Sequence, residues 1–370
     1  MEKVYAMVLE KFGGPFTRME FDKPAPKNGE VLIKIAACGV CGSDVHVWKG
    51  EDKRSHLPMI LGHEGIGFIE SLGGAAKQDI MGHTLHEGDF VVWNRGVSCK
   101  SCYTCLVKRQ FYACPSRWSY GFSKSINDYP YLNGGYASHI LLTPETEVIR
   151  ILPKEEVQPT EDYSAFASAC CAGTTTACAF EQTKLQQGDN VVIQGPGPLG
   201  VYAVLFAKES GARNIVVVGG TRERLELCEK AGATLVIDRH STTAEQRVEM
   251  VRQACDGRGG DAVFELTGSA DAVPEGLQFT APCGTYTTAG IAVDVGDVPV
   301  NWFRDVVRKN ITVQGVWVGD SKNTWQAVEV YRKNKALLNT MVTHRIPLQN
   351  AHEALQMMER KAVIKAVLVP

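Results

Sequence analysis

The stretch NVVIQGPGPLG, residues 190–200, decides the fold of the middle of this chain. A short run with three β-branched residues comes first, and a glycine-rich turn follows it at once. The motif proper consists of Gly195, Gly197, Pro198, Leu199 and Gly200. Between a strand and a helix, the first glycine permits a tight turn, the second lets the backbone approach a pyrophosphate, and the third allows close helix packing. The motif therefore predicts a dinucleotide site; the alternative is a turn with a purely structural role.

Strand-like and helix-like runs alternate after this motif. Apolar, strand-like runs occupy 214–220, 234–238, 261–268 and 284–291. Helical runs separate 190–194 from 214–220 and 214–220 from 234–238, and such alternation predicts a parallel, doubly wound sheet. Within the last two strand runs, we expect three further residues to contact the cofactor. They are Thr267, Gly290 and Ile291.

The second strand run lacks one expected feature. An acidic residue about twenty positions after the glycine motif usually binds the adenosine ribose. Gly219 and Gly220 stand there instead, and Arg222 follows directly. The absence of the acid and the presence of a nearby arginine slightly favour NADP over NAD, because an arginine pairs with a 2′-phosphate. The alternative is that Arg222 and Arg224 are solvated residues on a helix face.

Four closely spaced cysteines precede the nucleotide-binding region. They are Cys99, Cys102, Cys105 and Cys114. Four thiolates close a tetrahedral zinc shell and leave no open position, so the spacing predicts a structural zinc site. An iron–sulfur cluster also uses four thiolates and is the alternative, although no further cluster motif accompanies these residues.

A second set of metal-binding residue types is dispersed over GVCGSDVH (39–46) and LGHEGIG (61–67). The residues concerned are Cys41, Ser43, Asp44, His46, His63 and Glu64. Together with the cysteines and the glycine motif, these stretches resemble the zinc-dependent medium-chain alcohol dehydrogenases. The resemblance spans nearly the whole chain and includes GGYASH (134–139), CAGTTT (171–176) and VIKAVLVP (363–370).

The resemblance implies a catalytic zinc ion held by Cys41, His63 and Cys171. Three protein ligands leave the fourth position open for water or substrate, which is the catalytic pattern. Thr175 falls where the family's threonine meets the nicotinamide. Cys170, the neighbour of Cys171, is out of register and is expected to pack as a small buried hydrophobe.

The resemblance also assigns roles to the residues around that ion. Ser43 would bond the substrate oxygen, and His46 would receive its proton through the cofactor ribose. The alternative for His46 is a surface histidine on a turn. Asp44 would fix the tautomer of His63, and Glu64 would lie behind the metal.

The implied fold class is α/β, with two domains. A catalytic domain, 1–172 plus 319–370, would form a partly open, GroES-like β-barrel with the structural-zinc lobe. Residues 173–318 would form the doubly wound parallel (Rossmann) domain. Gly42 stands where many relatives carry a basic residue for the pyrophosphate, so we expect Lys365 to supply that contact.

Composition sets limits on partners. The chain has 370 residues and a net charge of -2, and no block of Lys and Arg points to nucleic acid or a membrane surface. No signal peptide or membrane-spanning apolar run is present in the sequence, so we expect a cytoplasmic protein whose cysteines stay reduced. The β-rich run 310–319 favours edge pairing into a homodimer or homotetramer.

The sequence thus predicts an enzyme that interconverts a small alcohol and its aldehyde or ketone, with two zinc ions per chain and NAD(P)(H). A polyol or sugar-alcohol dehydrogenase is the alternative within the family. A non-catalytic NADPH-binding protein is the alternative outside it, but a retired site has no reason to keep three ligands in register. Trp93, Asn94 and Arg95 precede the cysteine lobe, where the family places part of its pocket wall. Arg95 would contact a polar or anionic substrate, or would point to solvent.

Overall fold

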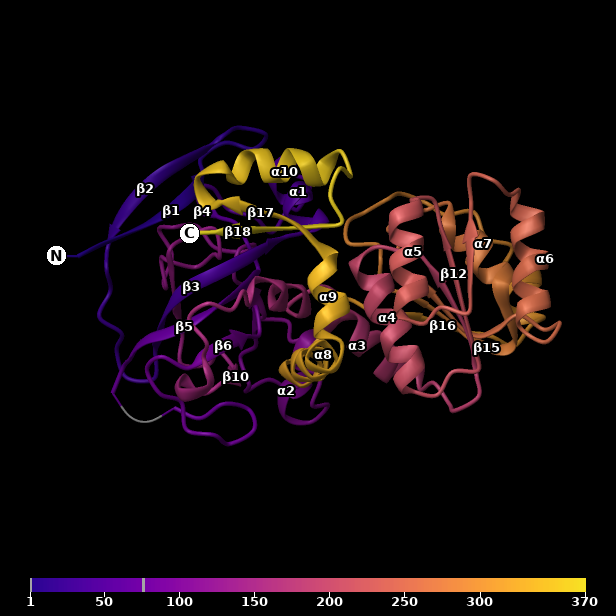
Figure 1. Cartoon of the computed structure of the whole chain (residues 1–370), viewed down its shortest axis with the longest axis horizontal. Coiled ribbons are helices and arrows are strands. Elements are labelled where there is room, and N and C mark those ends of the chain that lie inside the picture. Colours follow the sequence, from indigo (N-terminus) through magenta and orange to yellow (C-terminus); the bar gives the residue numbers. More distant parts are fainter. Residues whose placement is uncertain (1, 75–76) are drawn as a thin grey trace. The chain divides into compact units, whose positions relative to one another are not determined.

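The structure is a computed structural model that describes residues 2–74 and 77–370 (Figure 1). The chain divides into two compact units, Met1–Cys171 with Asp320–Pro370, and Ala172–Gly319. The boundaries expected from the sequence, after 172 and 318, each differ from this division by one residue. We call the first the catalytic unit and the second the nucleotide unit.

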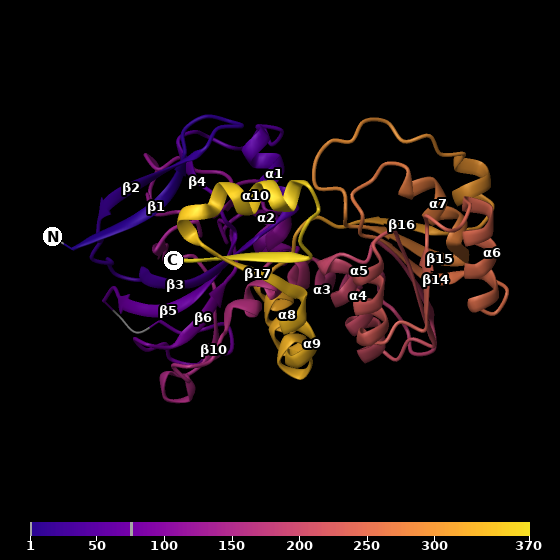
Figure 2. The same cartoon turned by 45° about the horizontal axis from the view of Figure 1, so that its top comes forward.

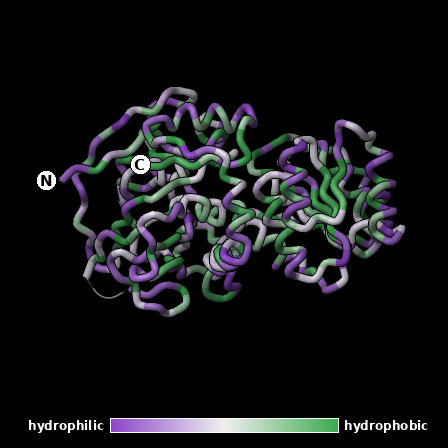
Figure 3. Tube along the Cα trace, viewed as in Figure 1, coloured by the Kyte–Doolittle hydropathy of each residue, from purple (hydrophilic) through white to green (hydrophobic). Residues whose placement is uncertain are grey.

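The nucleotide unit contains one six-stranded sheet in which every pair of neighbours is parallel. Its strand order is β13-β12-β11-β14-β15-β16. The strands are β11 (Asn190–Gln194), β12 (Asn214–Gly219), β13 (Leu235–Asp238), β14 (Gly260–Glu265), β15 (Thr280–Thr288) and β16 (Thr312–Gly315). These strands are mostly buried and hydrophobic, as Figure 3 shows in green, because helices cover the sheet.

Helices connect most of these strands and give the unit its doubly wound character. They are α3 (Ala172–Thr183), α4 (Pro198–Glu209), α5 (Arg222–Ala231), α6 (Ala244–Ala254), α7 (Ala272–Phe279) and the π-helical turn η4 (Phe303–Val307). The parallel sheet predicted from the alternation of strands and helices is confirmed.

The catalytic unit is mainly antiparallel. A three-stranded sheet has the order β2-β1-β4, and a larger sheet runs β10-β6-β5-β3-β18-β17, with β9 also paired to β3. Only β17 and β18 pair in parallel within it. In the described residues this larger sheet stays open at β10 and β17, which agrees with the expected partly open barrel.

The strands of the catalytic unit are β1 (Lys3–Leu9), β2 (Phe16–Asp22), β3 (Val31–Val40), β4 (Met59–Ile60), β5 (Glu64–Leu72), β6 (Phe90–Trp93), β7 (Gly96–Val97), β8 (Trp118–Ser119), β9 (His139–Leu142), β10 (Val148–Leu152), β17 (Val342–Pro347) and β18 (Lys365–Val369). Strands β7 and β8 form a separate two-stranded ribbon. The helices are α1 (Gly42–Lys49), α2 (Tyr103–Leu106), α8 (Ser321–Lys333), α9 (Lys335–Met341), α10 (Ala351–Glu359) and the 3-10 turns η1 (Phe111–Ala113), η2 (Lys154–Glu156), η3 (Ser164–Ala169) and η5 (Leu348–Asn350).

Long-range pairings bring distant segments of the catalytic unit together. The last strand, β18, lies antiparallel to β3, and α10 packs on α1 (Figure 1 and Figure 2). Strand β5 lies on the other side of β3 and starts at Glu64. The ends of β3, β5 and β18 therefore meet near the start of α1. Across the described residues, no helix is long and apolar enough to cross a membrane.

Candidate metal and cofactor sites

Four potential metal donors converge inside the catalytic unit. One ligand atom each from Cys41, His63, Glu64 and Cys171 lies within 4.8 Å of the others. Cys41 directly precedes α1, while His63 and Glu64 lie at the start of β5. Cys171 follows η3, more than a hundred residues later. The fold therefore assembles this donor cluster from three separate segments.

The spacing of the donors fits a tetrahedral zinc ion. The Sγ atoms of Cys41 and Cys171 lie 4.0 Å apart. Two thiolates at about 2.3 Å from one tetrahedral ion would be separated by about 3.8 Å. The Nδ1 atom of His63 is 3.0 Å from Asp44 Oδ1, so its Nε2 is left to face a metal. The expected partnership between Asp44 and His63 is present.

Asp44 also fixes the backbone beside Cys41. The Cys41 N–H donates to Asp44 Oδ2 at 2.9 Å, which completes a capping box at the start of α1. The hydroxyl of Tyr136 donates to the same oxygen at 3.3 Å. Asp44 is fully buried, so its charge depends on these donors.

Ser43 lies beside the donors and His46 lies farther along α1. Ser43 Oγ is 3.2 Å from Cys41 Sγ and 3.5 Å from His63 Nε2. His46 is partly exposed, and its Nδ1 is 2.5 Å from Glu51 Oε2. Ser43 therefore borders the place where the donors converge, while the hydrogen-bond partner of His46 is an acid at the end of the helix.

Glu64 and Lys365 form a buried ion pair. The Lys365 amino group contacts Glu64 Oε2, and both side chains are almost fully inaccessible to solvent. A side chain at Gly39 would overlap this carboxylate, since its Cβ would lie 1.9 Å from Glu64 Oε2. We expected Lys365 to contact the cofactor pyrophosphate. In the structure its amino group pairs with Glu64 instead.

Only one of the two adjacent cysteines joins the donor cluster. A hydrogen bond from Cys41 lowers the pKa of the Cys171 thiol, and the charge of Arg95 lowers it further against the effect of burial. Cys170 donates its thiol to the carbonyl of Gly65 at 3.6 Å, and burial raises its pKa. Cys171 is thus disposed to be a thiolate, whereas Cys170 remains a protonated, buried thiol.

The four cysteines of the lobe form a second, separate donor set, whose Sγ atoms all lie within 4.8 Å of one another. The Sγ separations are 3.5 Å for Cys102–Cys105, 3.5 Å for Cys99–Cys114 and 4.0 Å for Cys102–Cys114. Hydrogen bonds from the side chain and backbone of Ser101 lower the pKa of Cys99 to about 6. The set can supply four sulfur ligands to a tetrahedral ion and has no carboxylate or imidazole among them.

The glycine motif has the geometry that a pyrophosphate site requires. Gly195 has a φ of +106°, which L side chains rarely adopt, and it ends β11. A Cβ on Gly200 would lie 2.0 Å from the Gly195 carbonyl oxygen, so the third glycine permits close helix packing. Gly197 caps α4, and a Cβ there would meet nothing within 4 Å. The space beside Gly197 is open for a ligand to approach the helix N-terminus.

Steric crowding at the end of β12 explains why no acidic residue stands at position 219. A Cβ on Gly219 would lie 2.4 Å from Pro196 Cγ, within the glycine-rich turn. Any side chain at 219, including a carboxylate, would displace that turn. Arg222 begins α5, is highly exposed, and pairs with Glu226 at 2.9 Å. In this structure Arg222 therefore has the contacts of a solvated helix residue.

Two residues that the sequence analysis did not single out also lie at this strand end. The Arg239 N–H donates to the Gly219 carbonyl at 2.8 Å. A Cβ on Gly220 would lie 2.7 Å from His240 Nε2 and 3.2 Å from Arg239 Nε. Both residues follow β13, and only the parallel pairing of β12 with β13 brings them here. No local motif marks them.

The remaining expected cofactor residues belong to the nucleotide unit. Thr267 Oγ1 donates to Glu265 Oε1 at 2.7 Å, just after β14. The Gly290 N–H donates to the Glu265 carbonyl at 3.0 Å, so Thr267 and Gly290 share one strand end. Ile291 follows and is partly exposed, and Thr175 is buried in α3. Ligands in doubly wound sheets bind at such carboxyl ends.

Known proteins share both parts of this chain. Residues 27–154 match the model of the alcohol dehydrogenase GroES-like domain, and residues 198–332 match that of the zinc-binding dehydrogenase. A 5-exo-hydroxycamphor dehydrogenase of Pseudomonas putida is 32% identical over 93% of this chain and 92% of its own length. The chain belongs to the zinc-dependent medium-chain alcohol dehydrogenase family.

Other members of this family resemble the chain over its full length. A D-arabitol-phosphate dehydrogenase of Enterococcus avium is 28% identical over 95% of this chain and 92% of its own. The crystal structure of an alcohol dehydrogenase from Thermotoga maritima is 41% identical and covers all of both chains with a TM-score of 0.94. The chain is thus an oxidoreductase of the zinc-dependent alcohol dehydrogenase type.

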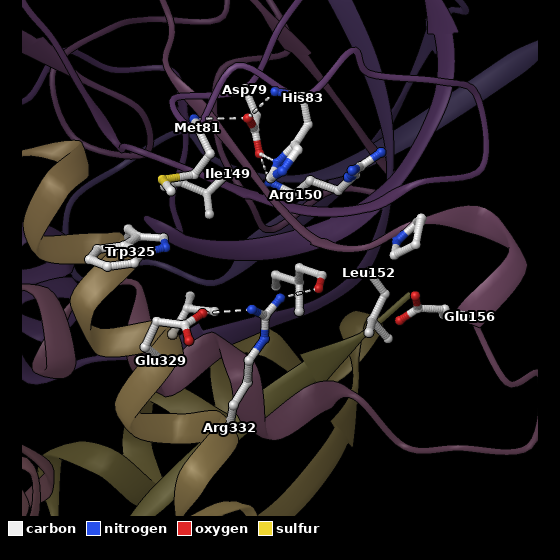
Figure 4. Close-up of a pocket in the computed structure, with 13 residues that line it drawn as sticks. Asp79, Met81, His83, Ile149, Arg150, Leu152, Glu156, Trp325, Glu329 and Arg332 are labelled. Carbon is white, nitrogen blue, oxygen red and sulfur yellow. Dashed lines mark hydrogen bonds and ion pairs between the residues drawn. The ribbon is translucent and has the colours of Figure 1, made fainter.

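A surface pocket of this dehydrogenase is separate from the donor cluster. It has a volume of about 440 Å³ and is lined by β10, the segment 79–83 and residues of α8 (Figure 4). Several of its polar groups are already paired, for example Asp79 with His83, and Arg332 with Glu329 and the Ile151 carbonyl. None of the four metal donors lines it.

Proposed function

We propose that Cys41, His63 and Cys171 hold a catalytic zinc ion in this dehydrogenase. The convergence of two sulfurs and one free imidazole nitrogen, beside a serine hydroxyl, is the observation that carries the proposal. Three ligands leave one position for a substrate oxygen. We further propose a second, structural zinc ion in the lobe, held by Cys99, Cys102, Cys105 and Cys114.

When bound, the catalytic ion supplies a Lewis acid that makes a substrate hydroxyl more acidic. The residues of the chain orient the substrate and move its proton. Ser43 Oγ lies where it can accept that proton in a hydrogen bond, since it is 3.5 Å from His63 Nε2. Asp44 holds the imidazole of His63 at Nδ1, which turns Nε2 toward the donors; that nitrogen would bind a metal once its own proton has left.

His46 and Glu64 have supporting roles in this proposal. Glu51 holds His46 at Nδ1, which leaves Nε2 of this partly exposed ring to pass a proton to solvent. Glu64 balances the charge of Lys365 behind the donors. The glycine motif with Thr175, Thr267, Gly290 and Ile291 would hold a nicotinamide cofactor, which would supply the hydride chemistry when bound.

We propose a preference for NADP over NAD, held by cations at the end of β12. Pro196 excludes an acidic side chain at 219, so no carboxylate from that position would repel a 2′-phosphate. Arg222 starts the next helix, and Arg239 lies against Gly220. Arginines pair well with phosphate groups.

We also propose a homodimer formed through β16. This strand is the last in its sheet and pairs only with β15 among the described residues. Val313 on β16 is exposed, as are Trp302 and Phe303 nearby in sequence. An uncovered edge with apolar side chains favours pairing with a second copy. Light scattering should give twice the chain mass, and Val313→Lys should shift it toward one chain mass.

The proposed reaction is tested by a panel of primary, secondary and polyhydric alcohols with each cofactor. We expect zinc-dependent formation of NADPH, and more slowly NADH, with at least one class of alcohol. The opposite reaction is followed with the matching aldehydes and ketones. Tight NADPH binding without turnover of any compound would contradict an enzymatic role and support a non-catalytic NADPH-binding protein.

A further inference from the structure

Arg95 is a buried cation beside the donor cluster. It lies between β6 and β7 and is only 8% exposed. Burial lowers the pKa of its guanidinium, but the nearby Cys171, Cys41 and Glu64 outweigh that effect and raise the pKa. Its Nη1 atom is buried and has no hydrogen-bond partner in the part of the chain that the structure describes. A donor is thus left unused next to the reacting centre.

A second, partly buried arginine, Arg117, packs against the residue that follows Arg95. Strands β7 and β8 pair Gly96 with Ser119, which places Arg117 against the residue that follows Arg95. A Cβ on Gly96 would lie 1.8 Å from Arg117 Nη2. Arg117 bonds Ser119 Oγ at 3.0 Å, and its Nη2 is also buried without a partner among the described residues. The β7–β8 ribbon therefore places a second guanidinium group next to the residue that follows Arg95.

The negative groups near Arg95 already have partners. Lys365 pairs with Glu64, and Asp44 accepts bonds from His63 and the Cys41 backbone. A zinc ion would neutralise the two thiolates. Across the described residues, no carboxylate lies within ion-pair distance of Arg95. A buried, unpaired charge is costly, and charged groups of this kind are concentrated at ligand-binding and active sites.

We propose that Arg95 binds an anionic group of the substrate, so that this dehydrogenase acts on alcohols that carry a carboxylate or phosphate. The proposal rests on the function proposed above for Cys41, His63 and Cys171. Because Arg95 lies near the proposed ligands Cys171 and Cys41, the anionic group would lie only a few bonds from the reacting hydroxyl. The planar guanidinium suits two parallel bonds to such a group. Arg117 adds positive potential behind it.

The test compares pairs of substrates with and without an anionic group. The pairs are 3-hydroxybutyrate with 3-hydroxybutyramide, and glycerol 1-phosphate with glycerol, on the zinc-loaded full chain with its preferred cofactor. A charge-assisted contact should give at least one anion a kcat/KM about ten- to a hundredfold above its neutral partner. Arg95→Gln should bring that ratio close to one. Arg18→Met, an exposed arginine on β2, is the control and should keep it.

A second readout does not depend on turnover. The preferred anion should raise the thermal midpoint of the unmodified chain more than its neutral partner does, and Arg95→Gln should remove that difference. The proposal is overturned if no anion exceeds its neutral partner in either measurement, or if Arg95→Gln keeps the ratio. Turnover of neutral alcohols alone would overturn this proposal and leave the proposed reaction standing. Binding of an anion without turnover of any alcohol would do the reverse.

Discussion

Asp44 links three features of the donor cluster. Its two oxygens accept bonds from the imidazole of His63 and from the Cys41 N–H. One carboxylate therefore fixes a histidine ring, the backbone of a cysteine and the first turn of α1. Ligand residues of metal sites are commonly oriented in this way by a second group. A rigid donor set can accept an ion with little reorganisation of the chain.

At the same scale, the two adjacent cysteines should respond differently to serine. Cys171→Ser removes a proposed thiolate ligand and should abolish zinc binding at that site together with turnover. Cys170→Ser replaces a buried thiol that already faces the Gly65 carbonyl, and should cost about 1–2 kcal/mol of stability while keeping most activity. Zinc content, turnover and thermal midpoint of both variants are the measurements. Equal loss of zinc in the two would show that the proposed ligand is wrong.

The proposed preference for NADP also depends on single residues. Arg222→Ala and Arg239→Ala should each raise the KM for NADPH about ten- to a hundredfold and change that for NADH little, because a charge-assisted bond to the 2′-phosphate is lost. Gly219→Asp is unsuitable as a test, since its side chain would meet Pro196. If neither variant changes the KM for NADPH, both arginines are solvated residues, and the absence of an acid at position 219 does not select NADP over NAD.

At the scale of elements, the β11–α4 turn contains one glycine that permits helix packing and another that is proposed to let the cofactor approach. Gly200→Ala would push a Cβ against the Gly195 carbonyl and should lower the thermal midpoint by several degrees. Gly197→Ala meets open space at an ordinary φ of −74° and should leave that midpoint nearly unchanged. Its methyl group would, however, obstruct the pyrophosphate, so cofactor affinity should fall about tenfold or more. Unchanged cofactor affinity in Gly197→Ala would place the phosphates elsewhere.

The start of α8 should make stability depend on pH. Burial and the nearby Glu147 raise the pKa of Asp320 to about 6, against the effect of Arg117. The folded chain therefore holds this proton more tightly than the unfolded chain, and the free energy of unfolding falls as pH rises from about 4 to 6. Asp320→Asn keeps a capping side chain without the charge.

Relative to the unmodified chain, Asp320→Asn should gain about 1–2 kcal/mol between pH 4.5 and 7.5, after allowance for partial exposure of the carboxyl. Denaturant unfolding of both proteins at the two pH values gives that difference. A difference between the proteins that does not change with pH would show that Asp320 is not held in its protonated form.

At the scale of the whole molecule, local sequence patterns predicted some features, and long-range packing determined others. The four-cysteine spacing and the glycine motif lie within short segments, so the sequence predicted both arrangements. The alternation of strands and helices likewise predicted the parallel sheet. The assignment of Cys171 depended on family resemblance, because more than a hundred residues separate it from His63.

Other features depend on contacts that no local pattern records. Lys365 meets Glu64 because β18 and β5 both pair with β3, and Arg239 reaches Gly219 because β13 pairs with β12. The burial of Arg95 follows from the packing around the β7–β8 ribbon. Sequence analysis identified Arg95 as part of a pocket wall, but only the structure shows its unused donor beside Cys171.

Zinc content before and after brief chelation tests the central claim most directly. The donor cluster with three proposed ligands keeps one position open and should lose its ion first, while the four-thiolate lobe should retain its own. We expect two zinc ions per chain in the purified protein, one after brief chelation with loss of turnover, and recovery of both on adding zinc. One ion or none in the purified protein, or full turnover after the loss of an ion, would contradict the account.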